Sequence, residues 1–276
     1  MVRVALIGAG MMGTGLARLF AGVGWPVAVW DRDAAALARL IEAVPAAVAA
    51  ASLAEAIGDA VLVIEAVAER LPVKQAVFAE LAAAARGDAI LATNSSVIQV
   101  GAVGATLDDA AAARVVGTHF WNPPDLIPLV EVIAAARTAD ATVERTMALL
   151  TRAGREPVRV RRDVVPGNRL QHALWREAMS LVDEGVCSPA DVDHIVRRSF
   201  GARLAALGPL ENADLVGLEL TRDIHQVVLP MLSRASEPAA GLLERLAGGR
   251  TYLGSTADEA AAARARLAAH LRGAFA

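Results

Sequence analysis

A histidine, an asparagine and a glutamate lie close together in the middle of the chain, in the segment His119-Phe-Trp-Asn-Pro-Pro-Asp-Leu-Ile-Pro-Leu-Val-Glu131. His119 ends one apolar run, Glu131 lies inside the next, and a Pro-rich bend separates them. A carboxylate in an apolar strand is costly unless it has a partner, so we expect Glu131 to pair with His119. A neutral imidazole can take a hydroxyl proton near physiological pH, and the carboxylate would fix its tautomer. A histidine simply satisfied in the core is the alternative.

A glycine motif near the N-terminus predicts a dinucleotide site. The apolar run 2–7 leads into Gly8-Ala-Gly-Met-Met-Gly13 and then into a helical pattern. The first glycine allows a tight turn, the second lets a pyrophosphate approach the backbone, and the third lets the helix pack on the strand. The phosphates would bind at the helix N-terminus. A tight turn without a ligand is the alternative. The expected contacts are Gly8, Gly10, Met11, Met12 and Gly13.

An acidic residue indicates which dinucleotide would bind. Residues 26–30 form a second apolar strand that ends at Asp31, eighteen residues after Gly13. A carboxylate at this place can bind the ribose hydroxyls of the adenosine and disfavours a 2′-phosphate. The sequence therefore favours NAD over NADP, although the adjacent Arg32 leaves NADP open.

Strands and helices continue to alternate up to about residue 162. Continuous apolar runs predict buried parallel strands at 60–64 and 89–93. Pockets of open parallel sheets lie at the carboxyl ends of the strands. Four polar residues follow such ends: Glu69, Lys74, Asn94 and Ser96. The alternative to a role in the pocket is a surface charge for Glu69 and Lys74, and a helix N-cap for Ser96.

The second part of the chain has a different pattern. The strand–helix alternation stops near 162–166, and helical patterns follow at 168–184, 188–197, 209–232, 238–246 and 256–271. The sequence thus predicts an α/β protein: an N-terminal Rossmann-type, doubly wound sheet over residues 1–162, followed by an all-α domain over 163–276.

Composition excludes several classes of function. The net charge is −3 with no basic block, which argues against nucleic acid or an anionic membrane as a partner. The single cysteine, Cys187, excludes an intrachain disulfide and a cysteine-based metal cluster, and no other metal site is expected. There is no signal-peptide pattern and no apolar run near the ~20 residues that span a bilayer. We expect a cytoplasmic protein.

Several motifs together resemble the NAD-dependent L-3-hydroxyacyl-CoA dehydrogenases, a family that includes gulonate and carnitine dehydrogenases. They are the glycine motif, Glu65-Ala-Val-Ala-Glu69, Thr93-Asn-Ser-Ser96, His119-Phe-Trp-Asn-Pro, Leu129-Val-Glu131 and Asn168-Arg-Leu.

The resemblance implies NAD as cofactor and a role for each motif. His119 would be the catalytic base, paired with Glu131, while Ser96 and Asn168 would hold the substrate oxygens. The reaction would oxidise the 3-hydroxyl of a 3-hydroxyacyl-CoA or a related small 3-hydroxy acid, as in fatty acid metabolism, in a homodimer formed through the helical domain. Along the cofactor and nicotinamide would lie Glu69, Lys74, Asn94 and Asn122.

Three segments depart from the family pattern. Fewer than thirty residues separate Asp31 from the 60–64 strand, whereas the CoA enzymes usually insert a lysine-rich helical hairpin there. The Pro166-Gly-Asn168 hinge is shortened, and the usual lysine and Gly-Phe-Tyr are missing from the tail at 248–256. A free 3-hydroxy acid, or a short acyl thioester held loosely, is therefore the expected substrate.

Two other classes compete with this interpretation. β-Hydroxyacid dehydrogenases use a catalytic lysine in their helical half, but Lys74 is the only lysine of this chain. The other is a non-catalytic or crystallin-like NAD-binding protein of the same fold. Hydride transfer to NAD from any 3-hydroxy substrate would distinguish it from an enzyme.

Overall fold

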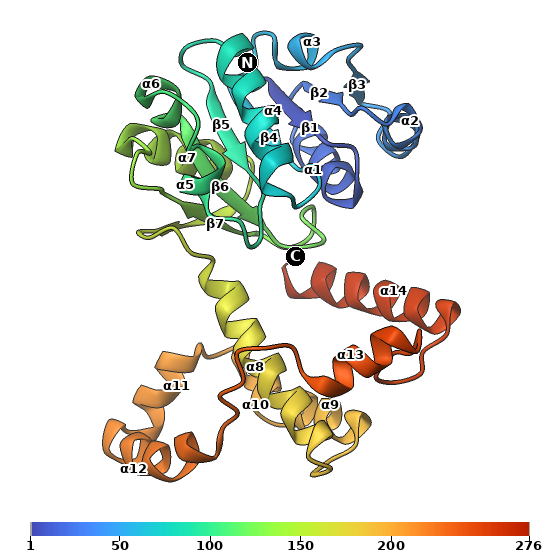
Figure 1. Cartoon of the computed structure of the whole chain (residues 1–276), viewed down its shortest axis with the longest axis vertical. Helices are drawn as coiled ribbons and strands as arrows, with labels where there is room; N and C mark the ends of the chain where they lie inside the picture. Colours follow the sequence, from blue (N-terminus) through green and yellow to red (C-terminus); the bar gives the residue numbers. More distant parts are fainter. Residues whose placement is uncertain (1, 276) are drawn as a thin grey trace. The chain divides into compact units, whose positions relative to one another are not determined.

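The computed structural model describes residues 2–275 (Figure 1). The chain divides into two compact units. One contains Met1–Pro166 with Ala265–Ala276, and the other contains Gly167–Arg264.

The first unit is built on an eight-stranded sheet with the order β3-β2-β1-β4-β5-β6-β7-β8. All neighbouring strands are parallel except β6 and β7, which are antiparallel. This arrangement confirms the expected Rossmann-type α/β fold. The strands are β1 (Val4–Ile7), β2 (Val27–Trp30), β3 (Ala47–Ala49), β4 (Leu62–Glu65), β5 (Ile90–Thr93), β6 (Val115–Phe120), β7 (Leu129–Ile133) and β8 (Glu156–Val160).

Apolar side chains cover both faces of this sheet. In β1, Val4 and Leu6 belong to one core cluster, while Ala5 and Ile7 belong to the other. Successive residues of a strand point to opposite faces, so a strand buried on both sides is apolar throughout. This explains why the strands were recognisable as continuous apolar runs.

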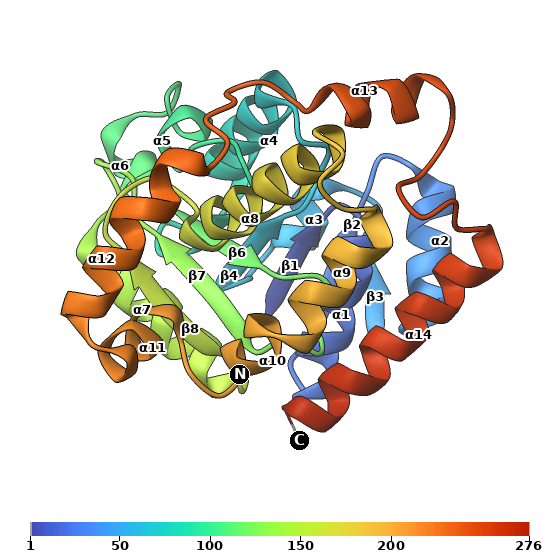
Figure 2. The same ribbon diagram turned by 90° about the horizontal axis from the view of Figure 1, so that it is seen from below.

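Within residues 2–166, seven helices accompany the sheet, and α7 lies beside β8 (Figure 2). Three of them, α3, α5 and α6, are not expected from the sequence, because four or five residues are too few to show a helical period. The helices are α1 (Met11–Gly22), α2 (Ala34–Ala43), α3 (Leu53–Ile57), α4 (Leu71–Ala84), α5 (Val100–Val103), α6 (Asp109–Ala112) and α7 (Asp140–Arg152).

The remaining elements are helical, as expected. Ser188 accepts a hydrogen bond from the Asp191 N–H and caps α9, with a proline at its first position. The prediction of one helix over 209–232 is wrong, because Gly217, with φ of +97°, separates α11 from α12. The elements are α8 (Pro166–Asp183), α9 (Pro189–Arg198), α10 (Phe200–Leu204), α11 (Pro209–Val216), α12 (Leu218–Val228), the 3₁₀ helix η1 (Leu229–Met231), α13 (Ala240–Ala247) and α14 (Ala257–Ala274).

The second unit has a very small core of its own. Within residues 167–264, only Val192 and Gly241 are buried. Large apolar side chains are exposed along α11 and α12. Across residues 2–275, none of the helices combines the length and the hydropathy that a membrane span requires.

Candidate active site

The antiparallel pair β6–β7 brings His119 and Glu131 together. The register places the two residues directly opposite each other. His119 Nδ1 lies 2.7 Å from Glu131 Oε2, and each side chain is 5% exposed. The expected partnership is therefore present, and it is formed by strand pairing across the bend between them.

This contact sets the chemistry of the imidazole. When Nδ1–H donates to the carboxylate, the lone pair of the neutral ring is on Nε2. The Trp121 ring packs edge-on against His119, with the ring centroids 5.2 Å apart. A buried, oriented imidazole with a carboxylate behind it has the arrangement of a general base.

Two asparagines connect His119 with the neighbouring loops. Asn94 follows β5, and its Oδ1 accepts the N–H of Phe120 at 3.0 Å. Asn122 is exposed, and its Nδ2 lies 3.7 Å from the sulfur of Met11 in the glycine loop. The structure thus places Asn94 beside the end of β6 and Asn122 beside the glycine loop.

The glycine loop has the close approaches that its motif predicts. A Cβ on Gly8, where φ is +116°, would lie 2.5 Å from the Ala66 carbonyl oxygen. A Cβ on Gly13 would lie 2.0 Å from the Gly8 carbonyl oxygen. Around Gly10, by contrast, there is open space within 4 Å. Two glycines therefore shape the loop, and the third leaves room above it.

The N-terminus of α1 suits a pyrophosphate. Its N-cap is Gly10, which offers no side-chain acceptor, and the first turn carries no acidic residue. The first N–H groups of the helix and the positive end of its dipole therefore favour an anion. Met11 is exposed and Met12 is partly buried in this turn.

Asp31 lies at the carboxyl end of β2, beside this loop. Its Oδ2 accepts the Ala9 N–H at 2.6 Å, and its Oδ1 accepts the Asp33 N–H at 2.8 Å. Each carboxylate oxygen can accept more than one hydrogen bond, so the partly exposed side chain can also accept ribose hydroxyls. These residues fit the adenosine and pyrophosphate parts of NAD.

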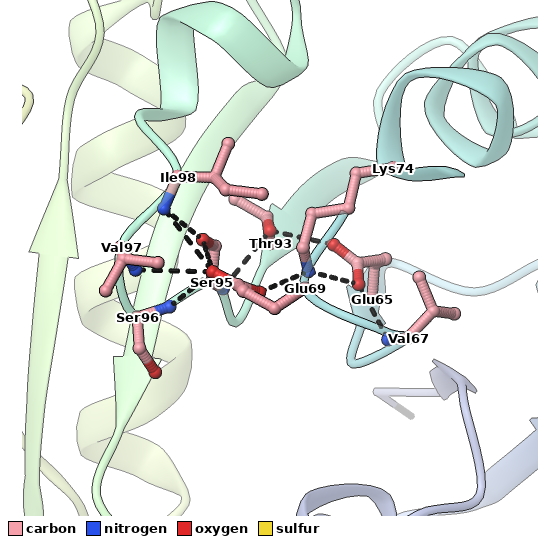
Figure 3. A network of polar contacts seen from close by, with 9 residues as sticks. All are labelled: Glu65, Val67, Glu69, Lys74, Thr93, Ser95, Ser96, Val97 and Ile98. Carbon is pink, nitrogen blue, oxygen red and sulfur yellow. Dashed lines mark hydrogen bonds and ion pairs between the residues drawn. The ribbon is translucent and has the colours of Figure 1, made fainter. Parts of the chain in front are cut away.

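Lys74 is buried, so the alternative interpretation of this residue as a surface charge is wrong. Its side chain is 1% exposed, and its Nζ lies 2.7 Å from Glu65 Oε1 and 3.1 Å from Glu69 Oε2 (Figure 3). Burial raises the pKa of Glu69, but the Ser95 hydroxyl and the charge of Lys74 outweigh it, so the pKa is below its usual value.

The two glutamates, Lys74 and the hydroxyl groups of Thr93 and Ser95 form one polar cluster. Three of its members were not recognised as site residues from the sequence: Glu65, Thr93 and Ser95. Glu65 had a visible signal, because it is a carboxylate that ends an apolar strand and has Lys74 nine residues later. Ser95 had none, because its partner Glu69 is 26 residues away.

The remaining candidates are Ser96 and Asn168. Ser96 is exposed in the loop after β5, and its N–H donates to Glu69 at 3.2 Å. Asn168 lies in the first turn of α8, in the other unit, and is partly buried. Within residues 2–275, no group of three or more histidine, cysteine or acidic residues is arranged to hold a metal ion.

Comparison with known proteins agrees with this geometry. Residues 3–52 and 47–164 match the NAD-binding domain of 3-hydroxyacyl-CoA dehydrogenase, and residues 166–258 match its C-terminal domain. One relative is 5-formyl-3-hydroxy-2-methylpyridine 4-carboxylate 5-dehydrogenase of Mesorhizobium japonicum. It is 34% identical over 264 residues, which cover 88% of this chain and 84% of the relative.

Two solved structures show how far the similarity extends. A 5-formyl-3-hydroxy-2-methylpyridine 4-carboxylic acid 5-dehydrogenase, described as an NAD⁺-dependent dismutase, superimposes with a TM-score of 0.93 at 30% identity, over 99% of this chain and 97% of the other. The 3-hydroxyacyl-CoA dehydrogenase of Archaeoglobus fulgidus superimposes with a TM-score of 0.76 at 29% identity, over 91% of this chain and 88% of the other. With its glycine loop, its His–Glu pair and both domains matched, the chain belongs to the 3-hydroxyacyl-CoA dehydrogenase family and is an oxidoreductase of that family with NAD as its cofactor.

Proposed function

We propose that the protein oxidises the 3-hydroxyl of a small 3-hydroxy acid, or of a 3-hydroxyacyl-CoA, to the 3-oxo compound. The observation that carries this proposal is the buried His119–Glu131 pair. It lies at the same edge of the sheet as the glycine loop, because β6 runs parallel to β5, β4 and β1.

His119 Nε2 takes the proton of the substrate hydroxyl, and Glu131 stabilises the imidazolium that results. Ser96 donates a hydrogen bond to the same substrate oxygen, and Asn168 orients the substrate. NAD supplies the hydride acceptor. The proposed contacts of its adenosine and pyrophosphate parts are Gly8, Gly10, Met11, Met12, Gly13 and Asp31, and those of its other half are Glu69, Lys74, Asn94 and Asn122.

A free acid is favoured over a CoA thioester by the segment between β2 and β4. The structure fills it with α2, β3 and α3, and its longest helix has ten residues. Its only basic residues are Arg32 and Arg39. A long cationic hairpin that could contact the phosphates of CoA is therefore missing from this segment.

A hydrated aldehyde is a second candidate substrate. The relative that superimposes over nearly the full length of this chain is named for a formyl-pyridine carboxylate, which favours this possibility. The hydrate carries a hydroxyl and a hydrogen on one carbon. Removal of its hydroxyl proton by His119 and loss of hydride to NAD would yield a carboxylic acid.

A substrate panel read by NADH absorbance tests these proposals. It would contain 3-hydroxybutyrate, carnitine, 3-hydroxybutyryl-CoA and 5-formyl-3-hydroxy-2-methylpyridine 4-carboxylate, each with NAD and with NADP. We expect the highest kcat/KM on a free acid with NAD. Much higher kcat/KM on the thioester would contradict the free-acid proposal, and no turnover of any member would favour a non-catalytic NAD-binding protein.

We further propose that residues 163–276 form a substrate and dimerisation domain of a cytoplasmic enzyme, with residues 1–162 as the NAD-binding domain. A second copy of the chain would cover apolar side chains that are exposed in the single chain. Leu220, Ile224 and Val227 recur at helical spacing on α12, and they are 53%, 45% and 68% exposed.

A further inference from the structure

Lys74 is a buried cation placed between two carboxylates. It extends from α4, and its ammonium group contacts Glu65 at the end of β4 and Glu69 in the following loop, at 2.7 and 3.1 Å. One positive charge thus balances two negative ones. Without it, the buried carboxylate of Glu65 would have no counter-charge and would lie near the partly exposed carboxylate of Glu69, which is unfavourable.

The first carboxylate, that of Glu65, is held by the sheet. Its Oε1 also accepts the Val67 N–H at 2.7 Å, and its Oε2 accepts the Thr93 hydroxyl at 2.8 Å. Glu65 is completely buried. Its position is therefore determined by β4 and β5, and it provides a fixed point for Lys74.

The second carboxylate, that of Glu69, holds the loop that follows β5. Its Oε1 accepts the Ser95 hydroxyl and the N–H groups of Ser96, Val97 and Ile98, the last three at 3.2, 3.3 and 3.3 Å. Figure 3 shows the Ser96 hydroxyl pointing away from this cluster, while its backbone nitrogen faces Glu69. The backbone of Ser96 is thus fixed from one side and its hydroxyl is presented on the other.

We propose that Lys74 is a positioning residue: by balancing Glu65 and Glu69 together, it holds the 95–98 loop so that the Ser96 hydroxyl meets the substrate oxygen. This inference rests on the proposed function. Lys74 then influences the reaction through Glu69 and the loop, without a contact of its own to the substrate.

The test is a double-mutant cycle between Lys74 and Ser96 on the full chain. Lys74→Met should lower kcat on the order of 10²-fold, since small misplacements of a reacting group have such effects. On a Ser96→Ala background the same substitution should have little further effect. Adding Glu65→Gln to Lys74→Met restores the charge balance and should recover kcat.

Arg137→Met is the control, because Arg137 is a basic side chain of the first unit that contacts the backbone carbonyls of Gly104 and Leu107 instead of this cluster. It should leave kcat unchanged. If Lys74→Met does not fold, Ser95→Ala keeps every buried charge and should show the same non-additivity with Ser96→Ala.

The inference would be overturned if Lys74→Met or Ser95→Ala lowered kcat by the same factor in the wild-type protein and in Ser96→Ala. Wild-type turnover in Lys74→Met would do the same. Wild-type turnover in Ser96→Ala would instead remove Ser96 from the proposed mechanism, and with it the basis of the inference, so the two failures are distinguishable.

Discussion

At the scale of the residue, the proposed chemistry depends on a histidine that has little freedom to rotate. Its Nδ1 is held by Glu131 at 2.7 Å and its ring by the edge contact with Trp121. Glu131 lies in β7 and Trp121 comes directly after β6, and these two strands are paired inside the sheet. The imidazole is therefore oriented before any substrate binds, and this reduces the reorganisation that the reaction requires.

Removal of this base should have a large and specific effect. We expect His119→Ala to lower kcat by about 10²–10⁴-fold, the usual contribution of a general base, with little change in the Kd for NAD. Steady-state kinetics would measure kcat, and a fluorescence titration with NADH, alone and in competition with NAD, would measure the affinity for the cofactor. Turnover within a few-fold of wild type would contradict the assignment.

Glu131→Gln tests the partner of the base. The amide can still accept the Nδ1 hydrogen bond through its oxygen, but it has no charge to stabilise the imidazolium. We expect kcat between those of wild type and His119→Ala. An unchanged kcat would show that the charge of Glu131 has no part in the reaction.

At the scale of the element, α1 depends on contacts that only glycine allows. A methyl group on Gly13 would lie 2.0 Å from the backbone oxygen of Gly8, and backbone atoms cannot move aside as a flexible side chain can. We expect Gly13→Ala to destabilise the protein by about 1–3 kcal/mol and to weaken NAD binding.

Gly22→Ala is a control within the same helix, because nothing lies within 4 Å of the added Cβ. It should be neutral or stabilising by up to about 1 kcal/mol, since alanine has the higher helix propensity. Thermal unfolding and NAD titration would distinguish the two variants. Equal stability of the two would show that Gly13 has no packing role.

Glu69 should make the loop after β5 sensitive to acid. Its folded pKa lies below the ordinary value of 4.5, because Ser95 and Lys74 outweigh the effect of burial. Its contribution to stability is therefore complete above about pH 4.5 and is lost as the pH falls through the lower folded pKa. Glu69→Gln should be less stable than wild type at neutral pH, and the difference should shrink below pH 4.5.

Urea unfolding of wild type and Glu69→Gln between pH 7 and pH 3.5 would measure this difference. Asp88 also has a lowered pKa, owing first to its hydrogen bond with Arg86, so wild type alone would not isolate Glu69. A constant difference across the whole range would contradict the expectation.

At the scale of the whole molecule, the second unit buries too little to be stable by itself. A helical region of this length usually has an apolar core, whereas here the large apolar residues of α12 face outward. Self-association would bury them, and the repeat of Leu220, Ile224 and Val227 suggests one helix face for it.

Ile224→Asp should therefore shift the protein from dimer to monomer in sedimentation velocity. Gln226→Asp adds the same charge on the opposite side of α12 and should leave the dimer intact. A wild-type protein that sediments as a monomer of 28.6 kDa would contradict the proposed dimer.

Much of the fold could be predicted because its signals are local. Apolar runs indicated the strands, and the glycine motif indicated the turn before α1. The His119–Glu131 contact could be predicted because a bend between two apolar runs brings their ends together. The contact of Ser95 could not be predicted, because it depends on a carboxylate 26 residues away. The break between α11 and α12 could not be predicted either, because it depends on the φ angle of Gly217.

The antiparallel pairing of β6 and β7 also separates the proposed catalytic pair from the bend that joins the two strands. His119 and Glu131 face each other through the backbone register of two strands, and beyond Trp121 and Asn122 the bend 123–128 joins these strands. Loops that replace this bend can therefore differ in length and composition without moving the pair, so exchanging it is a route to new substrate preferences. A one-residue deletion inside β7, by contrast, would turn Glu131 to the opposite face of the sheet and abolish catalysis.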